Sequence, residues 1–385
     1  MYIFIVLLTI QVFPIFAQTI NEQKVFSPYQ CKESKSPLLT NDNPHDYLDI
    51  KIITDFNTLL DKKDSTYRPA ILSYDLNEIE SVELPILIRG RGNSRRKYCH
   101  FIPLKIVFDK GDQLSAITNS KDLKTQYNAY SKYFNENPEL YKDFQGYEQE
   151  DNIFKKVGKK AKIITHCGNQ KNNNWILGGN EETQQNRVLQ EHYIYKMISS
   201  FTSMSLRSKL LNITYLNKDG ITLTTEMGII LEPKSSLAKR CSLSLTRNVS
   251  KANITAKKNI EFLNHFFYQK DYYFNNHNMI PLYSENEIYF TPYDYDLSGI
   301  IQPNYGKNFG HHSKYLSRFQ DWLNKDYTKN KLFVTTQVNT FLNKEKKMRS
   351  MISDSFLSEK VMNDMLDWFD TYSQALKNTL DETSK

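Results

Sequence analysis

The sequence predicts an α+β protein in which a β-rich N-terminal lobe is followed by a mainly helical C-terminal lobe. Short segments of alternating apolar and polar residues, typical of strands, recur between residues 48 and 108 and again between 161 and 231. Apolar residues recur at helical spacing in five segments between residues 259 and 378. The chain has 385 residues, enough for one large domain or two lobes with a substantial core.

The chain begins with an apolar, uncharged run at residues 1–17 that ends at Ala17. This run predicts a secretory signal peptide cleaved near Ala17. A membrane anchor is the alternative, but the run is short for a span and contains Pro14. No later stretch approaches the ~20 apolar residues of a transmembrane helix. We therefore expect an exported protein, periplasmic or extracellular, without a stable membrane span.

After an extended, proline-containing lead-in at residues 18–45, the N-terminal lobe is expected to occupy residues 46–232. Its strands are expected at Leu48–Thr54, Ala70–Tyr74, Glu83–Asn93 (a strand ending in a glycine turn), Pro103–Phe108, Ala161–Cys167, Leu210–Leu216 and Gly220–Leu231. Residues Leu59–Ser65 are expected to form a turn, and Asn217–Gly220 a hairpin turn. The pattern indicates an antiparallel, β-rich lobe.

Three other regions complete the expected organisation. Residues 110–152 are polar and poor in aliphatic side chains, which indicates a surface insertion with one or two helices around Leu123–Phe134. Thr183–Phe201 has the clearest helical spacing of apolar residues. The C-terminal lobe, residues 233–385, is expected to contain helices at Asn259–Tyr268, Ser313–Lys325, Lys331–Leu342, Lys346–Phe356 and Glu359–Asn378.

Net charge and cysteine content limit the kinds of ligand and site that we expect in this protein. The formal net charge of +7 is spread along the chain, which favours a phosphate-bearing ligand or an anionic surface. The sequence lacks a recognition motif for nucleic acid, so we expect no nucleic-acid partner. The four cysteines predict disulfides in an exported protein, with buried free thiols as the alternative. No Cys-x-x-Cys arrangement occurs, so we do not expect a zinc site.

The segment Lys270–Gly299 holds the most informative polar residues. Asp271 leads a group of asparagines that includes Asn276 and Asn278, and a strand-like run then ends at Asp294 and Asp296. Such oxygen ligands suit Mg²⁺ or another hard cation, and one carboxylate remains as a base. The spacing of Asp271 and Asn276 fits a kinase catalytic loop, and Asp294 follows a strand as a metal-binding aspartate would. An asparagine-rich loop followed by a turn is the competing interpretation.

Two other segments fit phosphate binding. Arg91 and Asn93 lie in a glycine turn after a strand, where backbone and guanidinium donors can approach a phosphate; a solvated basic turn is the alternative. Glu191 lies in the strongest helix and could face a phosphate-binding lysine, for which Lys105 and Lys162 are candidates. The alternative for Glu191 is an ordinary surface glutamate.

His166 and Cys167 are adjacent at the end of an expected strand. A Cys–His nucleophile pair is conceivable there. A core histidine beside a disulfide cysteine is the interpretation that we favour.

Taken in order, these segments resemble the CotH-like kinases, the secreted atypical kinases related to the spore-coat protein CotH, and within them a bacterial exported branch. The resemblance spans roughly Leu84–Gly299. The matching segments are Leu87–Ile106, Lys162–Cys167, Gln190–Ile198, Gly228–Pro233, Asp271–Asn278 and Pro292–Gly299. It implies an atypical, reduced protein-kinase-like fold that binds ATP and a divalent metal between two lobes.

The resemblance also implies roles for single residues. Asp271 matches the catalytic aspartate and Asp294 the metal-binding aspartate. Asn278 becomes a better metal ligand than Asn276, and Asp296 is a further metal ligand or a carboxylate that supports one.

The other matching segments carry further implications. Arg91 and Asn93 fall near the phosphates, whereas the ATP lysine stays ambiguous because the paired lysines of better-studied members are not clear here. Cys99 and Cys167 lie in segments that would be neighbours, and we predict that they form a disulfide.

The expected function is that of an exported kinase that transfers the γ-phosphate of ATP, with Mg²⁺ or Mn²⁺, to a hydroxyl acceptor, which we expect to be a protein or another alcohol. The alternative is a catalytically inactive exported binding protein on the same fold. A weaker third hypothesis uses two facing carboxylates for glycoside hydrolysis without a metal.

Overall fold

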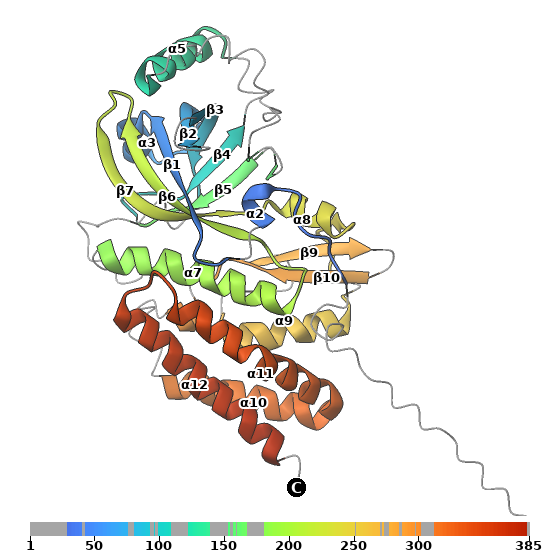
Figure 1. Cartoon of the computed structure of the whole chain (residues 1–385). Coiled ribbons are helices and arrows are strands. Elements are labelled where there is room, and N and C mark those ends of the chain that lie inside the picture. The colour runs from blue at the N-terminus through green and yellow to red at the C-terminus, as the bar shows by residue number, and fades with distance from the viewer. Residues whose placement is uncertain are drawn as a thin grey trace, which may run out of the picture.

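The N-terminal part of the chain is a closed barrel of seven strands, which the computed structural model in Figure 1 places above a layer of helices. The structure describes residues 29–382 except 41–42, 76–80, 93–95, 97–98, 109–121, 139–152, 155–156, 159, 168–180, 251, 270–271, 273–276, 285–286, 297 and 302–311. The expected signal peptide thus lies outside the described residues. The described chain is of mixed helix and strand, as the sequence predicts.

The barrel strands follow the order β1-β2-β3-β4-β5-β7-β6. They are β1 (Tyr47–Thr54), β2 (Arg68–Asp75), β3 (Ser81–Gly90), β4 (Leu104–Phe108), β5 (Lys160–Ile164), β6 (Ser208–Asn217) and β7 (Thr222–Leu231). The strands at these positions agree with the sequence prediction. The mainly antiparallel arrangement has one exception, because β1 and β6 pair in parallel and so close the barrel.

The barrel interior is filled by apolar side chains from alternate strand positions, as expected for a small barrel. On β3, for example, Leu84, Ile86 and Ile88 belong to the interior cluster, whereas Leu87 belongs to a cluster on the outside. Phe101 and Tyr215 add aromatic bulk to the interior, with ring centroids 4.4 Å apart. This alternation places the polar residues of β3, β4 and β5 on the outer surface of the barrel.

The predicted turn at Leu59–Ser65 is wrong, because helix α3 (Phe56–Lys62) covers its first half. The side chain of Asp55 accepts a hydrogen bond from the Thr58 N–H at 3.1 Å and so caps the helix. Phe56 and Leu59 are buried one helical turn apart. The cap and this spacing are a helix signal that the polar composition of the segment obscured.

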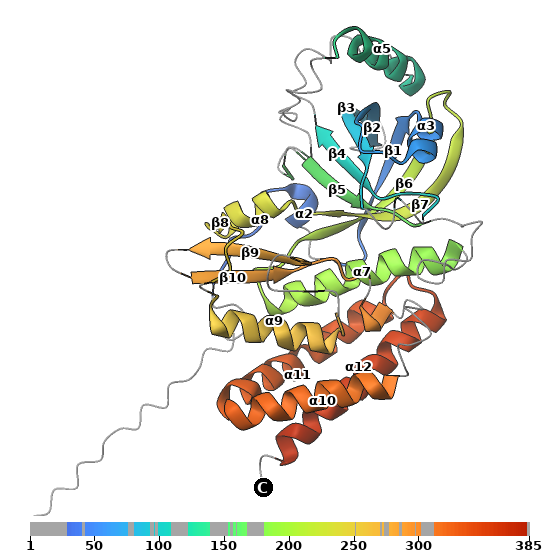
Figure 2. The same ribbon diagram turned by 180° about the vertical axis from the view of Figure 1, so that it is seen from behind.

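The region expected as a surface insertion, residues 110–152, contributes helix α5 (Leu123–Glu136), close to the predicted position. The helix buries Tyr127, Tyr130 and Phe134 against the outside of the barrel, and the Tyr130 hydroxyl donates to the Ile86 carbonyl at 3.1 Å. In Figures 1 and 2 it lies at the end of the barrel remote from α7. This helix is therefore an integral cover for one barrel face rather than only a surface feature.

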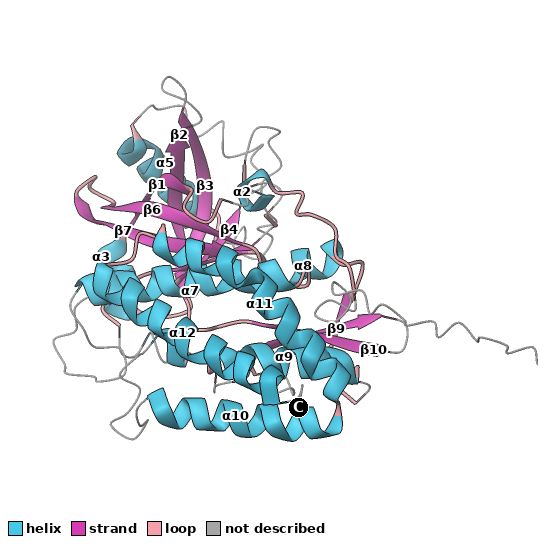
Figure 3. Cartoon of the chain, turned by 60° about the horizontal axis from the view of Figure 1, so that its bottom comes forward, coloured by secondary structure: helices cyan, strands magenta, loops and turns pink. Residues whose placement is uncertain are grey.

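Helix α7 (Glu181–Phe201) lies between the barrel and the C-terminal helices in both views. The C-terminal helices are α9 (Ile254–Phe266), α10 (His312–Lys329), α11 (Lys331–Ser353) and α12 (Glu359–Glu382). Figure 3 shows these helices gathered on one side of the barrel. Apolar side chains of α7 join theirs in the largest core cluster, so α7 links the barrel to the helical part.

Two helices were predicted where the structure has the single helix α11, because the intervening residues 343–345 (Asn-Lys-Glu) contain no helix breaker. The remaining elements include a small second sheet of three strands, in the order β10-β9-β8. They are α2 (Pro37–Thr40), α8 (Lys234–Arg240), β8 (Ser244–Leu245), β9 (Met279–Ser284), β10 (Glu287–Pro292) and the 3₁₀ turn η1 (Gly299–Ile301). Strands β9 and β10 form the hairpin that carries the candidate site.

The structure contains the predicted disulfide between Cys99 and Cys167. His166 is buried and stacks on Phe101, with ring centroids 4.8 Å apart, so the core histidine beside a disulfide cysteine is confirmed. The alternative of a Cys–His nucleophile is wrong, because the Cys167 sulfur is bonded to Cys99.

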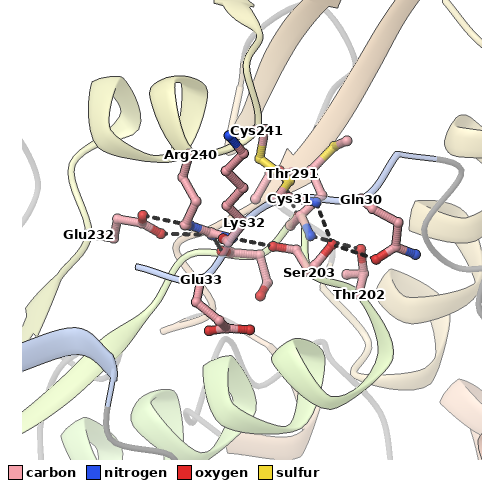
Figure 4. Close-up of a disulfide and its surroundings, with 12 residues drawn as sticks. Gln30, Cys31, Lys32, Glu33, Thr202, Ser203, Glu232, Arg240, Cys241 and Thr291 are labelled. Atoms are coloured by element: carbon pink, nitrogen blue, oxygen red, sulfur yellow. Dashed lines mark hydrogen bonds and ion pairs between the residues drawn. A yellow bond between two sulfur atoms is a disulfide. The ribbon is translucent and has the colours of Figure 1, made fainter. Parts of the chain in front are cut away.

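A second disulfide joins Cys31 to Cys241 at the end of α8 (Figure 4). Beside it, the Arg240 guanidinium donates to both carboxylate oxygens of Glu232 at 3.0 Å and to the Ser203 carbonyl at 2.7 Å. The Cys31 N–H donates to the Ser203 hydroxyl at 3.0 Å. These contacts fix the lead-in segment and α8 to the end of α7.

Two disulfides are typical of exported proteins. Within the described residues, no helix combines the length and the apolar character needed to cross a membrane.

Candidate functional site

The open end of the β9–β10 hairpin brings two of the predicted metal ligands together. The strand register pairs Met279 with Pro292, so Asn278 and Tyr293 face each other where the strands end. The Tyr293 N–H donates to the Asn278 carbonyl at 3.1 Å, and Asp294 follows directly. Both Asn278 (φ 50°) and Asp294 (φ 66°) have a left-handed backbone, which asparagine and aspartate tolerate better than most residues.

Asp294 is held at both of its backbone polar groups. Its N–H donates to the Tyr195 hydroxyl oxygen at 2.9 Å, and its carbonyl accepts a hydrogen bond from the side-chain amide of Gln269. The Tyr195 hydroxyl in turn donates to Glu191 Oε1 at 3.3 Å. Burial, helped by the negative charges of Glu191 and Asp294, raises the pKa of Tyr195 well above its usual value, so the phenol keeps its proton.

Glu191 lies one helical turn before Tyr195 on α7, so the two side chains lie on the same face of the helix. Its side chain is 1% exposed, and the alternative of an ordinary surface glutamate is therefore wrong. Through Tyr195, this buried carboxylate is connected to Asp294, which is about a hundred residues later in the chain.

A row of basic side chains crosses three neighbouring strands of the barrel. Arg89, Lys105 and Lys162 are cross-strand neighbours on β3, β4 and β5, and each is half-buried. They point outward because the adjacent Leu104 and Ile163 fill the barrel interior. The row therefore lies on the outer surface of the barrel.

Tyr293 joins this basic row to the hairpin. The Lys162 Nζ lies 5.5 Å from the centroid of the Tyr293 ring, and the Nζ of Lys234, from the start of α8, lies 4.0 Å from it. Both distances are within the range of a cation–π interaction. Two ammonium groups thus lie beside the residue that precedes Asp294.

The pKa of Lys162 reflects the positive charge of the surrounding cluster. Burial, together with the positive charges of Arg91, Lys234 and Lys105, lowers this pKa from 10.5 to about 8, whereas Asp294 acts in the opposite direction. The cluster therefore has an excess of positive charge in a half-buried place, which is typical of an anion-binding site. Of the two lysines left open by the sequence, Lys162 is the one for which the structure shows electrostatic coupling to Asp294.

Arg91 follows β3, and its N–H donates to the Pro103 carbonyl at 2.8 Å, which extends the β3–β4 ladder by one bond. Gly92 then adopts a φ of 81° and turns the chain away from the strand. Asn93, the next predicted phosphate contact, lies outside the described residues, as does the predicted base Asp271.

Asp296 is half-buried and separated from Asp294 by Tyr295, whose buried hydroxyl donates to Asn264 Oδ1 at 3.1 Å. Considering only the part of the chain that the structure describes, no group of three or more His, Cys, Asp or Glu side chains is placed to bind a metal. Magnesium in phosphoryl-transfer sites needs fewer protein ligands, commonly one or two carboxylates plus phosphate oxygens. The carboxylate and amide oxygens of Asp294 and Asn278 fit that requirement.

Four residues of this site were not predicted: Tyr195, Gln269, Lys234 and Tyr293. Tyr195 had a local signal, because it lies four residues after Glu191 on a predicted helix. The others contact the site through packing between distant segments, which sequence spacing does not reveal.

Comparison with known proteins finds no family model that matches this chain and no curated protein that matches it. The resemblance to CotH-like kinases therefore stays a prediction.

Proposed function

We propose that the protein is an exported phosphotransferase, which moves the γ-phosphoryl group of ATP to a hydroxyl acceptor with the help of Mg²⁺ or Mn²⁺. One observation carries the proposal: a half-buried basic cluster around Lys162 lies against Tyr293 and is electrostatically coupled to Asp294. Phosphoryl transfer relies mainly on positioning and on neutralising phosphate charge, and these groups supply both.

In this proposal the basic side chains receive the phosphates. Lys162, Lys105, Lys234 and Arg91 come from the barrel, from α8 and from the turn after β3. Bound phosphate would relieve the repulsion among them and raise the pKa of Lys162 toward its usual value, so that the lysine binds as an ammonium group.

The carboxylate and amide residues complete the proposal. Asp294 and Asn278 would hold the metal, which neutralises negative charge on the phosphates when it is bound. Asp296 would assist them. We assign Asp271 the role of accepting the proton of the acceptor hydroxyl; two residues before it in the sequence, Gln269 contacts the Asp294 carbonyl.

The test uses γ-labelled ATP with Mn²⁺ or Mg²⁺ and follows the label in protein and in free phosphate. We expect transfer by the wild-type protein, and a loss of at least about a hundredfold in Asp271→Ala and Asp294→Asn. Asp367→Asn, which changes an exposed carboxylate of α12, is the matched control and should keep full activity.

Calorimetry with Mg-ATP separates the possible outcomes. Binding without transfer would identify an inactive binding protein, the alternative that the sequence left open. A folded protein that binds no nucleotide, or an Asp271→Ala variant as active as the wild type, would refute the proposed site.

A further inference from the structure

We propose that Tyr195 is a positioning residue, whose hydroxyl holds Asp294 in the backbone conformation that presents its carboxylate to the metal. The inference rests on the proposed function and adds a residue that acts through Asp294 rather than on the substrate.

The surroundings of Asp294 support its backbone conformation. A left-handed backbone is uncommon for a residue with a side chain, although aspartate tolerates it better than most, and it persists where neighbouring groups hold it. Here the N–H is directed to the Tyr195 hydroxyl and the carbonyl to the Gln269 amide. The peptide groups on both sides of residue 294 are thus held by side chains from outside the hairpin.

Tyr195 is itself rigidly placed, which a positioning residue requires. Its side chain is 1% exposed, and its ring meets the Tyr295 ring edge-on, with centroids 6.0 Å apart and planes at 88°. Its hydroxyl donates to Glu191 and therefore has its oxygen available as the acceptor for Asp294. The hydroxyl therefore joins Glu191 of α7 to the backbone of residue 294, and replacing it tests this link directly.

The decisive variant is Tyr195→Phe, which keeps the ring and removes only the hydroxyl. We expect Mn²⁺ binding to the protein, measured with Mn²⁺ alone by electron paramagnetic resonance, to weaken about tenfold, as is typical when a group that orients a metal ligand is lost. Binding of ATP without metal, measured in EDTA, should change less than about threefold, because the basic cluster is untouched. A merely structural role would weaken both equally.

Tyr193→Phe is the matched control. It removes another buried hydroxyl from the same helix, one that accepts from the Phe356 N–H at 3.2 Å and does not touch Asp294. Its Mn²⁺ affinity should equal that of the wild type. Gln269→Leu acts on the opposite side of Asp294 and should weaken Mn²⁺ binding in the same direction as Tyr195→Phe, so the proposal stays testable even if one variant folds poorly.

The Asp294→Asn variant distinguishes a failure of the positioning role of Tyr195 from a failure of the phosphotransferase proposal. If Asp294→Asn abolishes Mn²⁺ binding while Tyr195→Phe binds like the wild type, the positioning role is overturned and the phosphotransferase proposal stands. If Asp294→Asn binds Mn²⁺ like the wild type, Asp294 is not a metal ligand, and both proposals are overturned.

Discussion

At the scale of single residues, the surroundings of Lys162 destabilise its charged ammonium form relative to a lysine in water. Its pKa of about 8 in the folded protein lies below the value of 10.5 expected in the unfolded chain. The folded state therefore binds this proton more weakly, and folding stability rises with pH between about 8 and 10.5. Below pH 8 the lysine is protonated in both states, and its full destabilising effect is present.

We predict that Lys162→Met stabilises the unliganded protein at pH 7 by at least ~1 kcal/mol, because it removes a poorly solvated charge from a basic cluster. The gain should shrink as the pH approaches 10. Urea unfolding at pH 7 and pH 9.5 measures both effects. Lys360→Met, at an exposed position of α12, should change neither value; equal stabilities of wild type and Lys162→Met at pH 7 would contradict the prediction.

Gly299 leads to a second prediction about a single residue. A Cβ atom at this position would lie 2.7 Å from Tyr268 Cδ1 and 3.0 Å from Trp368 Cη2, both buried. We expect Gly299→Ala to lower the free energy of unfolding by about 1–3 kcal/mol through overpacking. Chemical denaturation tests this, with Asn363→Ala on the exposed surface of α12 as the neutral reference; a change below ~0.5 kcal/mol would show that the site can relax.

Among the site residues, the sequence revealed those whose partners are local. Asn278 and Asp294 are joined by a short hairpin, and the resemblance to CotH-like kinases, rather than the spacing of the residues, had named the two together as metal ligands. Tyr195 and Gln269 approach Asp294 from α7 and from the end of α9, and their roles depend on how helices pack on the hairpin. Such contacts leave no periodic signal, because each depends on one side chain from a distant segment.

At the scale of elements, most strands and helices follow from apolar periodicity because each buries one face. The errors have local physical reasons. A turn was predicted where α3 begins, because the segment is polar and the capping role of Asp55 was not recognised. Two helices were predicted in place of α11, because residues 343–345 were taken as a break. The parallel β1–β6 pair was not predicted, because pairing between strands so distant in sequence depends on closure of the whole barrel.

The packing of α5 on the barrel gives a prediction at this scale. Tyr130 lies on the face of α5 that packs on the barrel and is fully buried, so Tyr130→Ala should lower the free energy of unfolding by about 3–5 kcal/mol. Tyr130→Phe should lower it by about 1 kcal/mol, because only the hydrogen bond to the Ile86 carbonyl is lost. Thermal and urea unfolding measure these losses. Asn135→Ala, at an exposed position of the same helix, should be neutral.

The two Tyr130 variants should bind nucleotide as the wild type does under conditions where they stay folded, because α5 lies at the end of the barrel remote from α7 and the β9–β10 hairpin. Weaker nucleotide binding in folded Tyr130→Phe would show that α5 is coupled to the site.

At the scale of the whole molecule, the two largest core clusters of the described residues and two disulfides hold the structure together. One core fills the barrel, and the other unites α7, the hairpin and the C-terminal helices. The sequence analysis counted α7 with the N-terminal lobe, whereas its apolar side chains pack in the same cluster as those of the C-terminal helices. Apolar periodicity predicts a helix but does not show which element the helix packs against.

The Cys99–Cys167 disulfide leads to a prediction about the stability of the whole molecule. It spans 68 residues and links the segments before β4 and after β5, so the variant Cys99→Ser/Cys167→Ser should lose about 2–5 kcal/mol of stability. Denaturation of the variant with its second disulfide intact measures the loss. Stability equal to that of the wild type would mean that the barrel alone constrains these segments.

The pairing of the four cysteines also determines how the chain must mature. One bridge, across 68 residues, lies wholly inside the loop of the other, which spans 210. Because Cys31, Cys99 and Cys167 all precede Cys241 in the sequence, we expect oxidation in order of appearance to join Cys31 to Cys99 or Cys167 and so to give mispaired molecules. Recovery of the native pairs then requires thiol exchange, and refolding from the reduced chain should give a higher yield in a glutathione buffer, or with an isomerase, than under a purely oxidising reagent.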